Sequence, residues 1–587
     1  MSIVKAAIKR EQWCLHRLPS VSRLDVKHQI VNIMKNIYKV WVLAAVVLMG
    51  TVTTGCERSN EVEALRNPYE PKQQQQQQED DSEELDEMGK TISAIPGVSN
   101  VHKDYELFGD REGYYFYVDQ LVDNSDVSKG TFKQMCFLEI TDLNAPVMLY
   151  TNGYELSRYI SGIEKHHIAK YLNCNSLYVE HRYFGESQPE PKTNINFTFL
   201  NAEQSAADLH QIVTLMKKYL FTKGNKWVST GTSKCGINTT LYAYYSDKYG
   251  WNDIDLYMPF CAPFLAGTAE SSADKSVGTY LKDVCGSGYP AGTNEDKAYK
   301  LLRAYPAAIV NNKALRDACL RFYYQAAPDA YLRLIRKYPA DIEKAATVGV
   351  LYDFYAYLLE KFAYIPFYSW CTMVPDPNDF DTVHPEKDDR LYKIVEFVFM
   401  TQKQLEEKLS AAGTSQNSAA ARRRGYSVDE IKTIRNSDYG LAYEIQALRE
   451  LGTLAQDYSL LPAGSFVTPE YCDEIARNNF GTLGYYGDVY TDQWDGGQLM
   501  KSVRSWVNTT TKRIVFVYGT NDAWTGGAID SDNLWGTGTV SVNPANSNVS
   551  KIWSMGGLHS HDFLETQLTF TPEASNAIKQ ALDQLKK

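Results

Sequence analysis

The chain has 587 residues, of which 44% are hydrophobic and 22% are charged. This composition is ordinary for a globular protein, and the length allows two to four domains or one large enzyme with an insertion. The formal net charge of −11 argues against a nucleic-acid partner. The ten cysteines contain no Cys-x-x-Cys pair, so we expect no zinc site and no other metal or cofactor.

The N-terminal region has the features of an export signal. We take Met34 as the true start, because a short charged stretch after it leads into an apolar run at 40–49. Such a run is too short to span a bilayer and is typical of a signal peptide. Small residues then end at Cys56, as in a bacterial lipobox, although Thr53 stands where leucine is usual. We predict a signal region at 1–55, with a plain cleaved signal or a short anchor as the alternative.

These features predict an exported lipoprotein of the cell envelope, on the outer surface or in the periplasm, with Cys56 lipidated and anchored in the membrane. Residues 56–95 would then form a disordered tether. Residues 73–78 are all glutamine, and residues 79–87 include seven acids in nine positions. Such a segment cannot bury enough apolar surface to order itself.

The first part of the folded body, at 96–266, has the pattern of an α/β sheet. Two alternating segments predict antiparallel strands, and compact apolar runs predict buried strands between helices. The strands are expected at 114–118, 134–140, 146–150, 175–179, 227–232 and 254–263, and the helices at 157–171, 201–220 and 237–249. Strand–helix alternation of this kind is typical of a parallel sheet.

The alternation stops at 267–503, where long helical patterns dominate, and we predict a helical cap inserted into the sheet domain. The α/β pattern resumes at 504–587 with apolar runs at 512–519 and 551–555 and a terminal helix at 572–585. Ligands of open α/β sheets bind beyond the carboxyl ends of the strands. Polar residues that follow these strands are therefore candidates for a functional site.

Ser233 is the first such candidate. It stands in Gly-Thr-Ser-Lys-Cys-Gly at 231–236, between a predicted strand and a predicted helix. A Gly-flanked serine in this setting indicates a nucleophile elbow, a crowded turn that exposes the serine hydroxyl and needs small neighbours. The helix that starts just after Ser233 would place N–H groups where an oxyanion forms. We expect those backbone donors to be the N–H of Lys234 and one N–H from the loop at Gly153 and Tyr154.

Asp522 and His559 follow the two apolar runs of the last segment. The order Ser, Asp, His is that of α/β-hydrolases. In such a triad histidine takes the serine proton, and the carboxylate orients the imidazole and stabilises its charged form. His561 is the alternative base, but Gly556-Gly557 favours His559.

Four ordered motifs resemble one family. Gly-Thr-Ser-Lys-Cys-Gly is joined by Glu-His-Arg-Tyr-Phe-Gly-Glu-Ser at 180–187, Tyr-Gly-Thr-Asn-Asp-Ala-Trp at 518–524 and Gly-Gly-Leu-His at 556–559. Together they resemble the secreted serine exopeptidases that include lysosomal Pro-X carboxypeptidase, dipeptidyl peptidase II and bacterial PS-10-type tripeptidyl aminopeptidases. The resemblance implies an α/β-hydrolase core with a large helical cap, inserted between the nucleophile Ser233 and the residues Asp522 and His559. Cys235 departs from the glycine that is common at its position in this family.

The resemblance also implies peptide substrates that are cut near their N-termini, with tripeptides as products. An aminopeptidase must bind the substrate's ammonium group, and Glu180 or Glu186 could do so. The alternative for these glutamates is a structural ion pair with Arg182. Two other functions remain open for the chain: an esterase or lipase on the same fold, and an inactive surface protein that captures peptides or glycans.

Overall fold

The computed structural model of the chain describes residues 85–156, 165–189, 197–264, 291–399, 442–479, 495–559 and 572–586, apart from short gaps at 327, 365–373, 444, 453–457, 459–460, 521, 531–534 and 537. The predicted signal region, the lipidation residue Cys56 and the alternative base His561 all lie outside these ranges. No helix in the described ranges is both long and apolar enough to cross a membrane.

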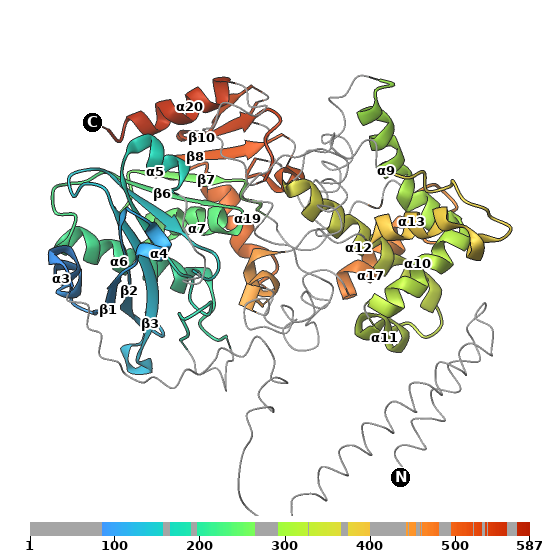
Figure 1. Cartoon of the computed structure of the whole chain (residues 1–587), viewed down its shortest axis with the longest axis horizontal. Helices are drawn as coiled ribbons and strands as arrows, with labels where there is room; N and C mark the ends of the chain where they lie inside the picture. Colours follow the sequence, from blue (N-terminus) through green and yellow to red (C-terminus); the bar gives the residue numbers. More distant parts are fainter. Residues whose placement is uncertain are drawn as a thin grey trace, which may run out of the picture. The chain divides into compact units, whose positions relative to one another are not determined.

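A ten-stranded sheet forms the centre of the described body (Figure 1). The strands in chain order are β1 (Val98–Lys103), β2 (Glu112–Leu121), β3 (Thr131–Ile140), β4 (Val147–Thr151), β5 (Asn175–Val179), β6 (Trp227–Thr232), β7 (Leu256–Phe260), β8 (Ile514–Gly519), β9 (Val540–Asn543) and β10 (Asn546–Ser554). In the sheet they lie in the order β1-β2-β3-β5-β4-β6-β7-β8-β10-β9. The run from β5 to β10 is parallel, whereas β1, β2, β3 and β9 pair antiparallel.

Helices cover both faces of this sheet, because the buried strands carry apolar side chains on both sides. On one face the core includes side chains of α3 (Glu87–Ser93), α6 (Ala202–Tyr219), α7 (Lys234–Tyr249) and α19 (Gln498–Trp506). On the other face it includes α4 (Tyr105–Phe108), α5 (His167–Leu172) and α20 (Pro572–Asp583) (Figure 1). The predicted α/β fold class is confirmed.

The amphipathic helix α6 shows why these segments fold as they do. Asn201 caps its N-terminus by accepting a hydrogen bond from the N–H of Gln204 at 2.9 Å. Apolar residues at helical spacing, such as Ile212 and Met216, are fully buried on the sheet side. Burial of each such side chain contributes about 2 kcal/mol. The sequence predicted this helix to within a residue at each end.

The inserted region has an apolar core of its own. Its helices are α9 (Asn294–Asn311), α10 (Lys313–Ala326), α11 (Pro328–Lys337), α12 (Ile342–Tyr364), α13 (Asp389–Val398) and α17 (Pro469–Asn479), with the short turn η4 (Pro385–Lys387) between α12 and α13. The long helical patterns of this region were predicted. The predicted bounds of the insertion, 267–503, also enclose residues of the sheet domain. Leu451 of the π-helix η6 (Ala447–Leu451) and side chains of α19 pack in the core of that domain.

The start of the folded body differs from the prediction. The sequence placed residues up to 95 in the tether, but α3 forms at Glu87–Ser93. Asp86 caps this helix through the N–H of Gly89, and Ile92 is fully buried in the sheet core. Ile95 is also buried in this core, and Leu85 and Met88 pack against it, so apolar side chains interspersed among the acidic residues anchor the helix.

Candidate active site

Ser233 occupies a strained turn between β6 and α7. Its φ of 61° and ψ of −125° lie outside the regions that L-residues prefer. The N–H of Ser233 donates to the carbonyl oxygen of Phe260 at 2.9 Å, which fixes the turn against the end of β7. A Cβ on Gly231 would lie 2.5 Å from the backbone of Cys235, and one on Gly236 would lie 2.8 Å from the oxygen of Phe260. The predicted crowded elbow is therefore present.

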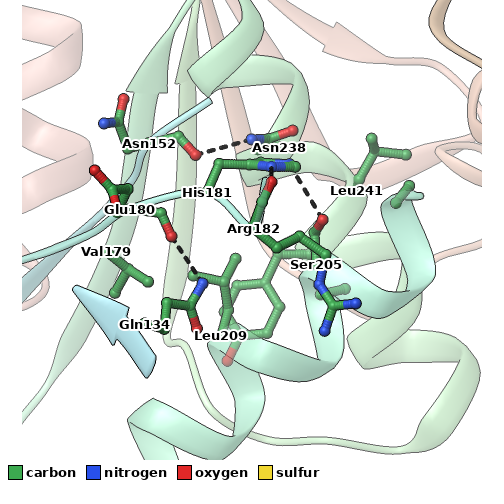
Figure 2. A pocket seen from close by; sticks show the side chains of 13 residues that line it. Gln134, Asn152, Val179, Glu180, His181, Arg182, Ser205, Leu209, Asn238 and Leu241 are labelled. Atoms are coloured by element: carbon green, nitrogen blue, oxygen red, sulfur yellow. Dashed lines mark hydrogen bonds between the residues drawn. The ribbon is translucent and has the colours of Figure 1, made fainter. Parts of the chain in front are cut away.

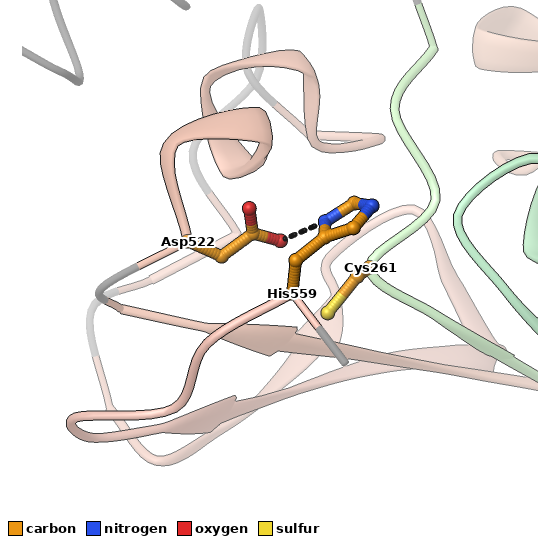
Figure 3. Close-up of side chains that lie close together, drawn as sticks. All are labelled: Cys261, Asp522 and His559. Atoms are coloured by element: carbon orange, nitrogen blue, oxygen red, sulfur yellow. Dashed lines mark hydrogen bonds and ion pairs between the residues drawn. The ribbon is translucent and has the colours of Figure 1, made fainter. Parts of the chain in front are cut away.

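Asp522 and His559 form a buried pair (Figure 3). Asp522 follows β8 and is 0% exposed, and His559 follows β10 and is 4% exposed. Nδ1 of His559 lies 2.8 Å from Oδ2 of Asp522. The other carboxylate oxygen accepts the N–H of Trp524 at 2.9 Å, so both oxygens are held. This arrangement fixes the imidazole through Nδ1 and leaves Nε2 as the nitrogen that faces away from the carboxylate.

Ser233 and this pair belong to the same edge of the sheet. The parallel strands β6, β7, β8 and β10 are consecutive neighbours, and the three residues follow the carboxyl ends of β6, β8 and β10. The link runs through β7: Phe260 accepts the N–H of Ser233, and the next residue, Cys261, donates its N–H to Val517 of β8 at 2.8 Å. The sequence predicts an α/β-hydrolase triad of these three residues, and strand ends at one edge of the sheet are the places such a triad needs.

Cys261 is a member of this site that the sequence reasoning missed. It directly follows β7, with a φ of 47°, and it is 1% exposed. One ligand atom from each of Cys261, Asp522 and His559 lies within 4.8 Å of the other two (Figure 3). Burial and the neighbouring carboxylate of Asp522 raise the pKa of the thiol well above its ordinary value, so the thiol is protonated. Its place near the carboxyl end of the strand predicted at 254–263 was the available signal.

Among the described residues, these three side chains also form the group that could hold a metal ion. The geometry favours an acid–base pair instead, because the Nδ1 atom and the carboxylate that would bind a metal are already bound to each other. A metal ion here would have to displace that hydrogen bond.

A close backbone approach sets the position of the histidine loop. A Cβ on Gly519 would lie 2.3 Å from the oxygen of Gly557, so the end of β8 admits only glycine. Thr520 then accepts the N–H of Gly556 at 2.7 Å and donates its own N–H to Ser554 at 3.0 Å. These contacts hold the loops that carry Asp522 and His559 against each other.

The loop after β4 packs against the first turn of α7, as expected for an oxyanion loop. The N–H of Gly153, however, donates to Sγ of Cys235 at 3.1 Å and to Oδ1 of Asn152 at 3.0 Å. The prediction that this N–H serves an oxyanion is therefore corrected: a thiol and an amide oxygen already take it. Lys234 opens α7, as predicted, and Tyr154 follows Gly153 in the loop.

Glu180 does not have either of its predicted roles. It is 0% exposed, and its carboxylate accepts hydrogen bonds from the N–H groups of Leu156, Glu186 and Ser187 and from the hydroxyl of Ser187, at 2.6–3.0 Å. Burial raises its pKa to about 7. The carboxylate thus organises the loop after β5 and is closed to a substrate's ammonium group.

Arg182 is bound to a different carboxylate from the one expected. Its guanidinium contacts Asp208 of α6 through two hydrogen bonds of 2.7 and 2.8 Å, and both side chains are 0% exposed. Glu186 is exposed, and its carboxylate accepts the hydroxyl of Tyr117. The predicted ion pair between Arg182 and a neighbouring glutamate is therefore wrong, because α6 supplies the partner.

A small cavity lies beneath the elbow helix, between α6, α7 and the loop after β5 (Figure 2). Its volume of about 20 Å³ is enough for roughly one water molecule. His181 borders it, with Nδ1 2.8 Å from the oxygen of Arg182 and Nε2 3.1 Å from Oγ of Ser205. Burial lowers the pKa of His181 well below its ordinary value, so the ring is neutral. The cavity is too small to hold a peptide. The residues around it support the elbow helix and the loops of the site.

Residues 83–292 match the family described as PS-10 peptidase S37. The predicted resemblance is confirmed over this region. The prolyl tri/tetrapeptidyl aminopeptidase of Streptomyces mobaraensis is 30% identical over 206 residues, which are 33% of this chain and 39% of that protein. The serine protease vicPb of Bipolaris victoriae is 26% identical over 208 residues, which are 30% of this chain and 38% of that protein.

The matched PS-10 region ends at residue 292, within the predicted insertion. The chain spans less than half the length of these two relatives. Among solved structures, the peroxisomal alpha-beta-hydrolase Lpx1 of Saccharomyces cerevisiae aligns over 81% of this chain and 88% of its own, with 10% identity and a TM-score of 0.30. The α/β-hydrolase assignment therefore rests on the sheet, the elbow and the strand-end residues described above.

Proposed function

We propose that the chain is a serine peptidase that removes short peptides, tripeptides in particular, from the N-termini of peptides. The observation that carries this proposal is the strained Ser233 at the same sheet edge as the buried pair of Asp522 and His559. The match of the surrounding region to PS-10 peptidases supports peptides as substrates.

In the proposed reaction, Oγ of Ser233 attacks the carbonyl carbon of the scissile peptide bond. Nε2 of His559 takes the hydroxyl proton, and Asp522 stabilises the imidazolium that results. The negative charge that develops on the carbonyl oxygen faces the N-terminus of α7, where the N–H of Lys234 and the helix dipole stabilise it.

The tetrahedral intermediate then breaks its carbon–nitrogen bond. The imidazolium of His559 gives its proton to the leaving amine, and the N-terminal peptide remains as an ester on Ser233. A water molecule, deprotonated by the same histidine, attacks this ester, and the imidazolium that results returns a proton to Oγ of Ser233 as the ester bond breaks. The peptide leaves as a carboxylic acid, which ionises to a carboxylate by giving its proton to solvent. The neutral base is restored, so the cycle balances without a cofactor.

A fluorophosphonate probe tests the nucleophile. We expect the probe to label the folded protein at Ser233, and the Ser233→Ala variant to lose both labelling and peptidase activity. Ser229→Ala is the matched control, because Ser229 is a buried serine of the same strand β6 that lies away from its carboxyl end. A folded wild-type protein that does not react would indicate an inactive binding protein.

Peptide–coumarin substrates with free and blocked N-termini test the exopeptidase step. The name of the Streptomyces relative and the helical insertion support this part of the proposal. We expect cleavage of the free peptides and little cleavage of the blocked ones. Equal cleavage of both would refute exopeptidase action, and hydrolysis of acyl esters without any peptide cleavage would establish an esterase.

We also propose that the protein is exported and anchored in the cell envelope through a lipid on Cys56. The apolar run at 40–49 and the small residues before Cys56 support this proposal. Expression of the whole chain in a bacterium with labelled palmitate should give a labelled, membrane-bound protein. Cys56→Ala should remove the label and release the protein, and an unlabelled wild type would contradict the proposal.

A further inference from the structure

Lys234, the residue after the proposed nucleophile, is a buried lysine. Its side chain is 2% exposed, and Nζ donates a hydrogen bond to the carbonyl oxygen of Gly153. The stem of the lysine packs directly on that loop, since a Cβ on Gly153 would lie 3.0 Å from its Cγ. Helix α7 therefore contacts the loop after β4 through two side chains, those of Lys234 and Cys235.

Three aromatic rings surround the ammonium group. Nζ lies 4.4 Å from the ring centre of Phe184, 5.1 Å from that of Tyr154 and 5.9 Å from that of Tyr443. The rings also contact one another, because the centre of Tyr154 lies 6.0 Å from both Phe184 and Tyr443. An ammonium group within about 6 Å of a ring centre is attracted to the ring face. We call these three rings the lysine cage.

The lysine cage joins three separate parts of the chain. Tyr154 belongs to the loop after β4, Phe184 to the loop after β5, and Tyr443 to the inserted region just before η6. Residues 442–451 are held here by further contacts: Ala442 and Ile445 pack with Phe184, and a guanidinium nitrogen of Arg449 donates to the oxygen of Phe197. The ammonium of Lys234 is therefore where the insertion meets the elbow.

Burial of the charged Lys234 side chain at this contact costs desolvation free energy. Burial lowers its pKa to about 7, while Cys235 and Glu450 of η6 act in the opposite direction. Burial also raises the pKa of Glu450 to about 7. The described residues include no carboxylate at ion-pair distance from Lys234. After burial, the charge of Lys234 also contributes to the lowered pKa of His181. An apolar side chain at this position would avoid the desolvation cost, so a mere packing role does not explain a lysine.

We propose that Lys234 is a positioning residue that sets the oxyanion loop 152–154 and makes its geometry depend on the docking of residues 442–451. This inference rests on the proposed peptidase function. In a planar trans peptide the N–H of one residue points opposite the carbonyl of the residue before it. Holding the carbonyl oxygen of Gly153 therefore fixes the direction of the Tyr154 N–H, a loop donor predicted for the oxyanion.

The Lys234→Met variant tests this role, because methionine keeps the apolar stem and removes the ammonium. We expect kcat to fall about 10²–10³-fold, which is the effect of losing one oxyanion donor. KM and the affinity for the product peptide should stay within about twofold, because the loop acts on the transition state. A peptide aldehyde, which forms a tetrahedral adduct on serine, should bind more weakly in proportion to kcat.

Lys226→Met is the matched control. Lys226 directly precedes β6, the strand that leads to the elbow. Its side chain is 48% exposed and forms an ion pair with Asp255. We expect its kinetic constants to match those of the wild type. Equal losses of aldehyde and product binding in Lys234→Met, or an unchanged kcat, would overturn the proposal.

A second pair of variants tests the dependence on the insertion, and it also decides the matter if Lys234→Met does not fold. Tyr443→Leu removes one ring of the lysine cage, whereas Tyr443→Phe keeps it. We expect a severalfold greater loss of kcat and of aldehyde affinity in the leucine variant, and a non-additive effect when it is combined with Lys234→Met. Equal behaviour of both Tyr443 variants would contradict the coupling. A wild-type protein without any peptidase activity would instead refute the proposed function.

Discussion

The Nδ1 atom of His559 lies 2.8 Å from Oδ2 of Asp522, and neither side chain is more than 5% exposed. Since both carboxylate oxygens have protein donors, the pair is rigid before any substrate binds. Burial away from solvent also strengthens the electrostatic interaction between a charged imidazole and the carboxylate. The orientation of the proposed base thus depends on the charge and the acceptor geometry of one residue.

Asp522→Asn should lower kcat by about 10⁴-fold while the protein stays folded, because asparagine can hold the imidazole in the wrong tautomer. Steady-state kinetics with a peptide substrate and a thermal melt would check both parts. Asp126→Asn is the control and should leave kcat unchanged, because Asp126 is the N-cap of the exposed 3₁₀ turn η2 (Val127–Lys129). A loss below tenfold in Asp522→Asn would argue against its role.

Gly519→Ala should reduce activity by displacing the histidine loop. The added Cβ would lie 2.3 Å from the oxygen of Gly557, and relief of such overpacking costs about 1–3 kcal/mol. Gly538→Ala is the matched control, because its nearest neighbour would lie at an ordinary 3.6 Å. Urea unfolding and kcat of the two variants provide the measurement, and identical results for both would show that the close approach is unimportant.

Variants of Cys235 should separate the small size of its side chain from the hydrogen bond that its thiol accepts. Cys235→Ala removes one of the two acceptors of the Gly153 N–H and leaves Oδ1 of Asn152, and we expect a severalfold loss of kcat with a destabilisation of about 1 kcal/mol. Cys235→Ser keeps a small acceptor and should recover most of the activity. If alanine and serine behave alike, the hydrogen bond to the thiol has no functional weight.

Cadmium ions should inhibit the protein through Cys261. Cd²⁺ favours thiolate and imidazole ligands, and binding would take Nδ1 of His559 away from Asp522. Because burial raises the pKa of the thiol, inhibition should strengthen as the pH rises and the thiol proton is lost more easily. Cys261→Ser should relieve inhibition, whereas Cys319→Ser, at a buried cysteine of the helical insertion, should not. Inhibition that persists in Cys261→Ser would place the metal elsewhere.

The buried carboxyl of Glu180 should make stability depend on pH. Its pKa rises from 4.5 to about 7 on folding, so the folded state binds the proton more tightly than the unfolded state. The stability gained from that proton is present below pH 4.5 and is lost between pH 4.5 and 7.

The free energy of unfolding should therefore fall through this range, by at most about 1.4 kcal/mol per pH unit from this group. Urea unfolding of the wild type and of Glu180→Gln at pH 5 and pH 7 measures the difference. A variant whose stability falls with pH as steeply as that of the wild type would assign the dependence to other groups.

Local pattern was enough to predict the parts of the site that depend on strand ends. Ser233, Asp522 and His559 each follow a buried apolar run, and the small residues around Ser233 indicated the elbow before its strained φ was known. Their meeting at one edge follows from parallel strand order, which alternation of strands and helices predicts. The pairing of β7 with β8 across the whole insertion is the step that joins them.

Contacts between distant segments could not be predicted in the same way. Asp208 lies on α6, and nothing near Arg182 in sequence marks it as the partner. Glu180 was a candidate for binding a substrate's ammonium group, yet backbone N–H groups from two loops enclose its carboxylate. The capture of the Gly153 N–H by Cys235 likewise depends on a loop and a helix that 82 residues separate.

The cysteines of the described body have a practical consequence. Six cysteines there are buried thiols: Cys136, Cys174, Cys235, Cys261, Cys319 and Cys472. The first four lie around the sheet, and the last two lie in the core of the helical insertion. A thiol reagent can reach each one only when its surroundings open. Peptide-resolved alkylation rates would therefore measure the opening of the sheet domain and of the insertion separately, in one sample and without an added label.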